Sequence, residues 1–549
     1  MSARSRRIAR AALAALVIPV LALTACSGAR PDPLAPLDVP RGLSNTPAGA
    51  GRIDTLTWNI GTGEPASLDW IYAYDDSGNT TLANMCEGLM RQNEDMSLSP
   101  ALAERVDHPD ATTTVFTLRD NVRFWDGSPL TADDVVFSLQ RHLDPEAGSY
   151  WGVPFYDNVA SIEATSEREV TVRFEQPDAL FERMLATAAG IVGSRSFTER
   201  AGETYGTSQG GIMCTGPFKY VSWQPGSKIV MQRNADYWDP ELQPKADRVE
   251  LTFVTDETTI ANSLISGGID GAYNPPLSAT EMLSRADSGS LVLGESTDWM
   301  AVRPTETDGP MRQLPLRQAL SLILDRDAIA AAVYRGTATP SLTPIQPGAW
   351  GYARDVWQAA EREIPKPEFD VAAAKRLIDE NGLAGTKISI AIPADSEAES
   401  KVAEIMSAGA KRAGLQLEFH RMPQTAFTEL YFDAKAREPY DAFIVQEYGA
   451  GVADPIVSMS EFTPLSAYNY GAYDDPVLTG SVAKAMVTPD AEARAEVLAE
   501  GQRRVVEDLP LITIVNASSR VFQGSRITGA TASRALLYYP WAAKIGAAK

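Results

Sequence analysis

The chain has 549 residues, of which 44% are hydrophobic and 22% are charged, and its formal net charge is −22. This length accommodates two or three domains and a large buried core. The acidic excess argues against nucleic acid or anionic lipid as a binding partner, because both would be repelled.

The N-terminus has the features of an export signal. It carries four arginines and no carboxylate in 25 residues, and its apolar stretch over 11–25 is short for a membrane span. Leu23 to Cys26 resembles a bacterial lipobox, in which cleavage precedes the cysteine and its sulfur carries diacylglycerol. We expect a signal peptide over 1–25 and an extracytoplasmic protein anchored to the bacterial cell membrane by lipid on Cys26. A soluble signal peptide or an uncleaved anchor is the alternative, and both Sec and twin-arginine export stay open.

A flexible tether is expected next, over residues 26–51. This stretch is rich in proline, glycine and alanine and has no apolar periodicity. Removal of the four signal arginines takes the net charge of the remaining chain to −26. Beyond the tether, no internal repeat or low-complexity block interrupts the sequence, which predicts a continuous folded part.

Alternating and helical patterns in the second half predict α/β structure. Residues 387–392 alternate, a helical pattern follows and stops at Gly414, and residues 415–419 alternate again. This order predicts a strand, a helix and a parallel strand. The apolar run 442–445 is typical of a strand covered on both faces. A comparable unit lies within residues 249–269, so we expect two α/β lobes.

Residues 98–177 have a different pattern. Short alternating stretches such as 113–118 and 170–174 are separated by turn residues such as Asp126 and Gly127. Hairpins are the expected structure, with one short helix that begins near Thr131. The sequence therefore predicts an antiparallel insertion in the first lobe.

Two loops are candidates for ligand contact, because ligands of open α/β sheets gather beyond the carboxyl ends of parallel strands. One loop covers residues 61–65 and the other covers 446–451. Aromatic and amide side chains near the crossing between lobes are suited to stacking and to backbone recognition. The candidate ligand-binding residues are Glu64, Tyr74, Trp299, Glu447, Tyr448, Asp454 and Asn469. For each of them, ordinary packing or solvation is the alternative.

Two cysteines remain beyond Cys26. They are Cys86 and Cys214, and an even pair in an oxidising compartment permits one disulfide. Two buried free thiols are the alternative.

Several stretches resemble one known family. The most specific are Asn84 to Leu89, Phe116 to Gly127 and Leu130 to Ser138, and further ones include Thr215 to Lys219. They are similar to the family 5 extracellular solute-binding proteins, which are dipeptide- and oligopeptide-binding components of ABC importers. These stretches mainly maintain the fold.

The resemblance implies a bilobal α/β fold of the periplasmic-binding-protein class II type that closes about a hinge. Lobe I would comprise 52–300 and 512–549, with an inserted α+β subdomain at about 90–185, and lobe II would comprise 301–511. Cys86 and Cys214 would then share one half of the molecule, which favours the disulfide. The expected partners are a small solute, most simply a peptide, and the permease subunits, and the expected state is a monomer.

One departure from the family pattern concerns the ligand. Peptide-binding relatives often carry a Gly-Trp-X-Ala-Asp motif whose aspartate pairs with the free amino group of the ligand. Alignment on Asp454 places the tryptophan at Tyr448 and the aspartate at Gly451. Glu447 or Asp454 is a candidate replacement. A nickel complex, an opine or an oligosaccharide is an alternative solute, and an envelope lipoprotein without transport function is an alternative role.

A secreted serine hydrolase is the competing class. Gly206 to Gly210 fits G-x-S-x-G around Ser208, but no buried strand precedes it and no helix can open at Gly216-Pro217. Of three histidines, His420 alone follows Ser208, as the α/β-hydrolase order requires. Zinc-protease, CxxC and P-loop motifs are also absent from the sequence, so we expect no enzyme activity, no cofactor and no metal site.

Overall fold

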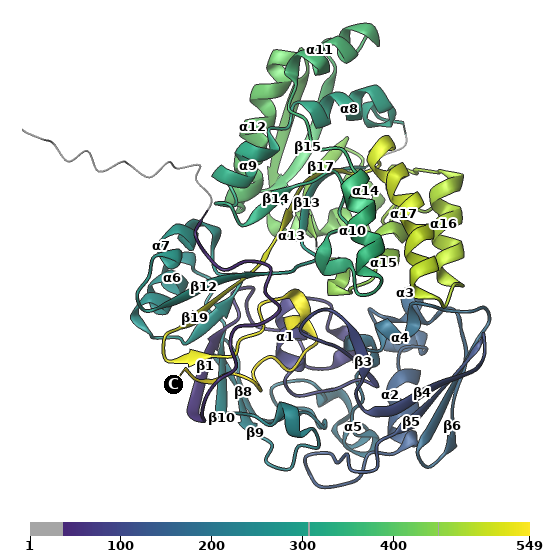
Figure 1. Cartoon of the computed structure of the whole chain (residues 1–549), viewed down its shortest axis with the longest axis vertical. Coiled ribbons are helices and arrows are strands. Elements are labelled where there is room, and N and C mark those ends of the chain that lie inside the picture. The colour runs from purple at the N-terminus through teal and green to yellow at the C-terminus, as the bar shows by residue number, and fades with distance from the viewer. Residues whose placement is uncertain (1–36, 306–307, 448, 549) are drawn as a thin grey trace, which may run out of the picture.

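The computed structural model describes residues 37–305, 308–447 and 449–548. The signal peptide, Cys26, the first part of the tether and Tyr448 lie outside these ranges. Within them, no helix combines the length and the apolar character needed to cross a membrane. Figure 1 shows a wide lower part, built from both ends of the described chain, and a narrower upper part.

Lobe I is built on a seven-stranded sheet of order β12-β19-β11-β1-β10-β9-β8. The central strand β1 is parallel to β10 on one side and to β11 on the other, and the remaining pairings are antiparallel. The helices α6 (Glu257–Ser266) and α7 (Thr280–Ser284) pack on one face with β12 and β19. The strands are β1 (Ile53–Asn59), β8 (Phe218–Gln224), β9 (Lys228–Arg233), β10 (Ala246–Thr252), β11 (Gly271–Tyr273), β12 (Gly289–Gly294) and β19 (Ser519–Gly524).

Lobe II is built on a six-stranded sheet of order β14-β18-β13-β17-β15-β16. One face buries an aliphatic cluster under α8 (Leu314–Leu322), α9 (Arg326–Ala332), α11 (Val371–Glu380) and α12 (Glu397–Ala413). The other face packs with α10 (Arg354–Glu363), α13 (Gln424–Phe432), α15 (Pro455–Ser460), α16 (Pro476–Met486) and α17 (Ala491–Asp508). The strands are β13 (Trp299–Pro304), β14 (Ala338–Pro340), β15 (Lys387–Pro393), β16 (Gln416–Met422), β17 (Ala442–Glu447) and β18 (Ile512–Ala517).

The predicted strand-helix-strand unit of lobe II is β15-α12-β16, with β15 and β16 parallel. The helix ends because Gly414 takes the left-handed conformation, with φ of +94°, which glycine adopts without steric cost. Isoleucines of β15 at alternate positions then face the aliphatic cluster. The α/β class expected from the sequence is confirmed.

The inserted subdomain contains a four-stranded antiparallel sheet of order β4-β5-β7-β6. Thr131 caps its helix α2 (Ala132–Gln140) by accepting a hydrogen bond from the amide of Asp134, whose carboxylate accepts one from the Thr131 amide. The subdomain and its surroundings comprise β2 (Met90–Gln92), β3 (Leu98–Pro100), β4 (Ala103–Asp110), β5 (Thr113–Leu118), α3 (Gly152–Tyr156), β6 (Val159–Ser166), β7 (Glu169–Phe174), α4 (Phe181–Met184) and α5 (Arg195–Ala201).

Across the described ranges, the chain passes between the two sheets twice. It leaves lobe I through residues 295–298 and returns through Ser518. The first strand of lobe II is β13, which begins at Trp299, and β18 pairs with β13 in the same sheet. The boundaries expected at 301 and 512 are therefore displaced, because apolar strands of the two sheets look alike in sequence.

The end of the expected tether is docked on lobe I. Thr46 donates a hydrogen bond from its hydroxyl to Gln523, and Gly51 forms a bridge with Ala547 in β21 (Gly546–Ala547). Gly49 permits close approach, since a Cβ there would lie 2.6 Å from the amide nitrogen of Gly546. The flexible stretch is thus shorter than expected, because composition does not reveal hydrogen bonds to residues near the other end of the chain.

Cys86 and Cys214 form a disulfide with a sequence separation of 128 residues. Both side chains are buried in the lobe I core. The bond joins the segment after α1 (Asp76–Leu82) to the segment before β8. It closes a long loop that contains the whole inserted subdomain.

Replacement of both cysteines by serine should lower the free energy of unfolding of lobe I by about 2–5 kcal/mol, because a long loop is released in the unfolded state. Urea unfolding followed by tryptophan fluorescence measures this change. The oxidised and dithiothreitol-reduced wild-type proteins provide the matched comparison. An identical unfolding midpoint for all samples would contradict a stabilising role of the bond.

Candidate functional site

A cavity of about 190 Å³ lies at the carboxyl ends of β1, β10 and β11 in lobe I. Because β1 has parallel neighbours on both sides, this is the point where the strand order reverses and where ligands of such sheets bind. The lining combines polar and apolar residues, and its polar members include Asn59, Thr62, Asp76, Glu257 and Asn274. The predicted loop 61–65 contributes its first two residues to this cavity.

Contacts along the hinge link the cavity to lobe II. Asp76 accepts a hydrogen bond from Arg534 at 2.7 Å, and Arg534 also pairs with Asp298 at 3.1 Å. Asp298 immediately precedes β13. Its burial raises the pKa of its carboxyl group, and the nearby Arg534 opposes this shift. One arginine of lobe I therefore lies between two carboxylates where the chain crosses between the lobes.

A second arginine lies between two carboxylates in lobe II. Arg303 on β13 is 3% exposed, and it contacts Glu447 and Glu461 at 2.7 Å each. Its guanidinium lies 5.6 Å from the Trp299 ring centre and 5.8 Å from that of Tyr470. The pKa of Arg303 is raised, because both carboxylates favour the charged form more than burial disfavours it. The cluster of Arg303, Glu447 and Glu461 carries one surplus negative charge when all three groups are ionised.

Glu447 has one oxygen without a partner. Oε2 accepts the hydrogen bond from Arg303, whereas Oε1 is buried and unpaired. The pKa of Glu447 is raised to about 7, because burial and the charge of Glu461 together outweigh the opposing effect of Arg303. This carboxyl group therefore titrates near neutral pH in the absence of a bound cation.

The other sequence candidates divide into two groups. Trp299 lies beside Arg303, is 2% exposed and has an unpaired indole nitrogen. Tyr74 is 50% exposed and lies 5.3 Å from Tyr150, which hydrogen-bonds to Tyr468 of lobe II. Trp299 and Tyr74 are thus placed where lobe I and lobe II approach each other.

Glu64 and Asn469 make local contacts instead. The Glu64 carboxylate accepts hydrogen bonds from the Trp223 indole and from the Gly226 amide, so it supports the β8–β9 turn. The Asn469 side chain bonds to backbone atoms of Thr463 and Tyr473 and fixes its own loop. Tyr448 lies outside the described residues.

Asp454 contacts lobe I. Its carboxylate lies 3.5 Å from Arg183 of α4, with exposed side-chain fractions of 0% for Asp454 and 8% for Arg183. It also accepts hydrogen bonds from the Tyr352 hydroxyl and the Ile456 amide. Burial raises the pKa of Asp454, and Arg183 opposes this shift. Asp454 therefore joins the lobes through a buried ion pair.

The loop before Asp454 is also held by lobe I. The Gln92 side chain donates to the Gly451 carbonyl at 2.9 Å and accepts from the Ala453 amide at 3.1 Å. Gly451 has φ of +67°, and a Cβ there would lie 2.5 Å from Cδ1 of Leu537. The space that an aspartate side chain would need is filled by lobe I.

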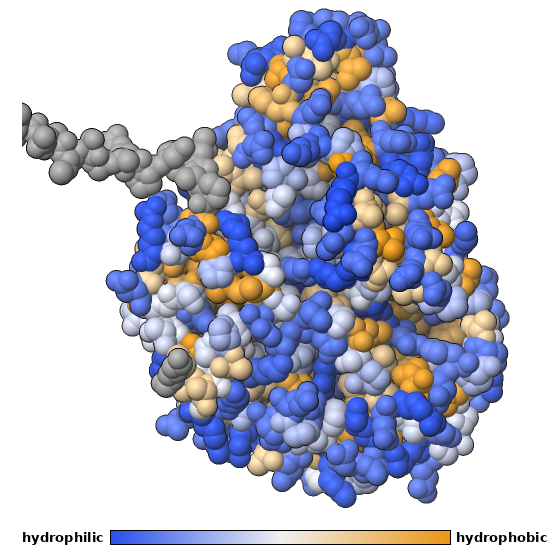
Figure 2. All heavy atoms as spheres, in the orientation of Figure 1, coloured by the Kyte–Doolittle hydropathy of each residue, from blue (hydrophilic) through white to orange (hydrophobic). Residues whose placement is uncertain are grey.

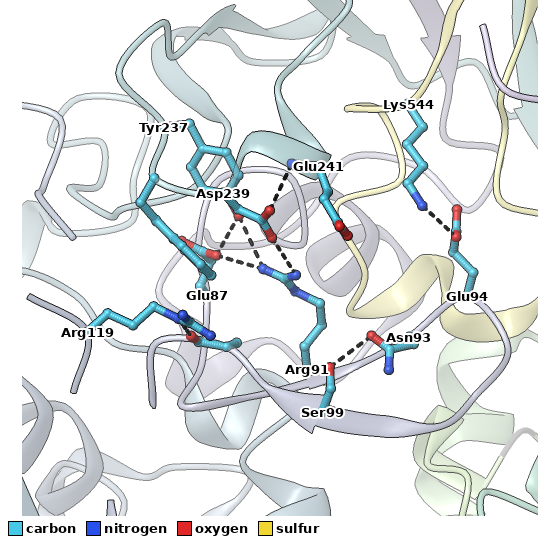
Figure 3. Close-up of polar contacts among 12 residues, drawn as sticks. Glu87, Arg91, Asn93, Glu94, Ser99, Arg119, Tyr237, Asp239, Glu241 and Lys544 are labelled. Atoms are coloured by element: carbon cyan, nitrogen blue, oxygen red, sulfur yellow. Dashed lines mark hydrogen bonds and ion pairs between the residues drawn. The ribbon is translucent and has the colours of Figure 1, made fainter. Parts of the chain in front are cut away.

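A buried polar cluster beside the disulfide supports the lobe I fold (Figure 3). The Glu87 carboxylate accepts hydrogen bonds from Tyr237 at 2.7 Å, Thr215 at 2.8 Å and Trp238 at 3.1 Å. Arg91 pairs with Glu87 and, at 2.9 Å, with Asp239. Since both Glu87 oxygens are occupied by protein groups, the cluster holds the segments around the disulfide together.

Two further features concern the molecular surface and the side chains that commonly bind metal ions. Figure 2 shows that one face of the molecule is largely hydrophilic, with small separate hydrophobic patches, as the acidic composition suggests. Over the ranges that the structure describes, no three His, Cys, Asp or Glu side chains form a group that could hold a metal ion.

Residues 97–470 match the family model of bacterial extracellular solute-binding proteins, family 5. The chain belongs to this family. The dipeptide-binding protein DppE of Bacillus subtilis is 23% identical over 488 residues, which cover 85% of this chain and 87% of the relative. The expectation of a family 5 solute-binding protein is confirmed, and the relatives found are binding proteins.

Two solved structures have the same fold. The periplasmic binding protein DppA from Helicobacter pylori in complex with peptide STSA has a TM-score of 0.74 at 21% identity, covering 91% of this chain and 99% of that one. AgaA of Agrobacterium tumefaciens R10 in complex with agropinic acid also has a TM-score of 0.74 at 21% identity, covering 90% and 98%. The bilobal periplasmic-binding-protein fold is thereby confirmed.

Replacement of Glu447 by Gln should change how stability depends on pH. Between about pH 4.5 and pH 7 the folded protein keeps a proton on Glu447 that the unfolded chain releases, so the free energy of unfolding falls as pH rises. The limiting slope for one proton is about 1.4 kcal/mol per pH unit. Calorimetric unfolding from pH 5 to pH 8 should show this contribution in the wild type and in Glu418→Gln, whose carboxylate is exposed, but not in Glu447→Gln. Parallel pH profiles for all three proteins would refute the assignment.

Replacement of Arg183 by Met should destabilise the protein by about 3–5 kcal/mol, because Asp454 would stay buried without its partner. Small-angle scattering should also show a larger radius of gyration, since the pair joins the lobes. Arg195→Met is the matched control. Its ion pair with Glu199 is exposed to solvent, so its loss should leave the free energy of unfolding nearly unchanged. Equal changes in stability and in radius of gyration for the two substitutions would show that the Arg183–Asp454 ion pair does not hold the lobes together.

Proposed function

We propose that this protein is the solute-binding component of an ABC importer, and that it captures a short peptide between lobe I and lobe II and delivers it to the permease. Lipid on Cys26 would hold it outside the cell membrane. Family membership supports the class. A dipeptide-binding relative and a neighbouring fold with a bound peptide support the choice of solute.

The arrangement of the lobes carries the proposal. Each lobe has its own sheet, and the described chain crosses between them only at residues 295–298 and Ser518 (Figure 1). Contacts far from these crossings in sequence bring the lobes together, through Gln92, Arg183 and Tyr538. Two rigid bodies with a narrow connection open and close about it, so a solute that contacts both lobes stabilises the closed form.

The buried polar groups support a small solute with a cationic group. The cluster around Arg303 has a surplus negative charge when Glu447 is ionised, and Glu447 has an unpaired oxygen. A bound cation would compensate this charge in a site that excludes water. The α-ammonium group of a peptide meets that requirement.

Protein purified without denaturation should release a peptide that mass spectrometry identifies, and the same spectra should show diacylglycerol on Cys26. Removal of the peptide should increase the radius of gyration in solution, and its return should restore the compact form. Release of an opine, an oligosaccharide or a metal complex would overturn the proposal. A radius of gyration that is the same with and without the peptide would also overturn it.

A further inference from the structure

Three side chains form a row across the centre of the lobe II sheet. Strand β13 lies between β17 and β18, and its first residue, Trp299, pairs with Glu447 on one side and Asn516 on the other. Directly opposed residues of antiparallel strands project from the same face. Neighbouring strands are about 4.8 Å apart, so the row spans roughly 10 Å.

Each member of the row has a buried polar atom without a hydrogen-bond partner. These atoms are Oε1 of Glu447, Nε1 of Trp299 and Oδ1 of Asn516. Along the row, these atoms are a hydrogen-bond acceptor, a donor and a second acceptor. Since an unpaired buried polar atom costs free energy, three of them in one row indicate that something else completes their hydrogen bonds.

The charges around the row indicate which kind of group would complete the hydrogen bonds of its unpaired atoms. Arg303 already saturates Oε2 of Glu447 and pairs with Glu461, so the surplus negative charge lies beside Oε1. The groups near this end include the hydroxyls of Tyr150, Tyr431, Tyr468 and Tyr470, and the guanidinium of Arg437 lies 4.0 Å from the Tyr470 ring centre. The charges that act on the Glu447 carboxyl group itself are those of Arg303 and Glu461. A cationic donor is therefore the best match for Oε1.

The row lies on the path between the lobes. Asp298, next to Trp299, pairs with Arg534, which pairs with Asp76 in the wall of the lobe I cavity. At the Glu447 end, Tyr150 of the subdomain bonds to Tyr468. A solute on the row would thus contact lobe II along its length, and the ion pairs of Arg534 connect the Trp299 position to the wall of the lobe I cavity.

We propose that this row binds the amino-terminal end of a peptide, with the ammonium group on Glu447, a carbonyl oxygen on Trp299 and a following amide N–H on Asn516. The proposal rests on the proposed function. An extended peptide advances 3.3–3.6 Å per residue, so the row spans about the first three residues. Gly451, where relatives carry the amine-binding aspartate, has no such role because Leu537 occupies the adjacent space.

Calorimetric titration with a defined mixture of tripeptides, before and after acetylation of their amino groups, tests the row. Wild-type protein should bind the free mixture, and acetylation should weaken binding by at least about tenfold. Glu447→Gln should weaken binding of the free mixture similarly and should leave the acetylated mixture little affected. Trp299→Phe and Asn516→Leu should each weaken binding several-fold, whereas Glu418→Gln, with an exposed carboxylate in the same lobe, should bind as the wild type does.

The outcomes separate the two proposals. Equal binding of free and acetylated peptides together with wild-type affinity in Glu447→Gln would overturn the row, whose atoms then bond to water only, and would leave peptide binding intact. No binding of either mixture by the wild-type protein would overturn peptide capture itself. Thermal unfolding of each variant identifies loss of fold, and Glu447→Asp, which keeps the charge, should recover part of the preference for free amino groups.

Discussion

The buried contact of Arg303 with Glu447 and Glu461 determines the charge balance inside lobe II. An arginine on the central strand of a sheet is costly unless carboxylates compensate it, and here two carboxylates do so at 2.7 Å. The second carboxylate exceeds what neutrality requires. Burial and, to a smaller extent, this excess charge raise the pKa of Glu447, and one of its oxygens stays available for a further cation. The interior of lobe II is therefore prepared for a positively charged group before any solute enters.

Contacts that close the molecule are distinct from those available to a solute. The loop from Gly449 to Asp454 accepts hydrogen bonds from Gln92 and Tyr538 of lobe I and forms an ion pair with Arg183. These polar groups of the loop therefore already have partners. These contacts favour the closed form without a solute. A solute then needs to supply only the remaining difference in free energy between the open and closed forms. In the proposed binding mode, the unpaired atoms of Trp299, Glu447 and Asn516 contact the solute.

Local periodicity predicted most of the secondary structure, because strands, helices and helix caps depend on residues that are neighbours in sequence. Alternation in β15 and β16, the glycine after α12 and the cap at Thr131 are all set within a few residues. The loop rule also led to Glu447, which directly ends a buried strand. The limits of the lobes and the docking of residues 43–51 were missed, because both depend on pairing between distant segments.

The site was harder to predict for the same reason. Arg303 stands in an apolar stretch and gains its role from Glu447 and Glu461, which are 144 and 158 residues away. Glu64 looked available, but its partner Trp223 lies 159 residues further on. The one usable signal for Arg303 was a charged residue at the last position but one of a strand-like apolar run, where a buried charge requires a counter-charge.

In the proposed binding mode the ligand anchor is Glu447, and the glycine at 451 is consistent with this position of the anchor. Its left-handed backbone and the proximity of Leu537 leave no room for an aspartate, so the change at this position is coupled to packing from lobe I. Restoring the aspartate alone would place a charge against an aliphatic side chain and would strain the loop. Glu447 lies four residues earlier on a regular strand and has an arginine to orient it. A charged side chain on a sheet is positioned more rigidly than one on a loop. Binding of an ammonium group at Glu447 would therefore need no rearrangement of the loop from Gly449 to Asp454.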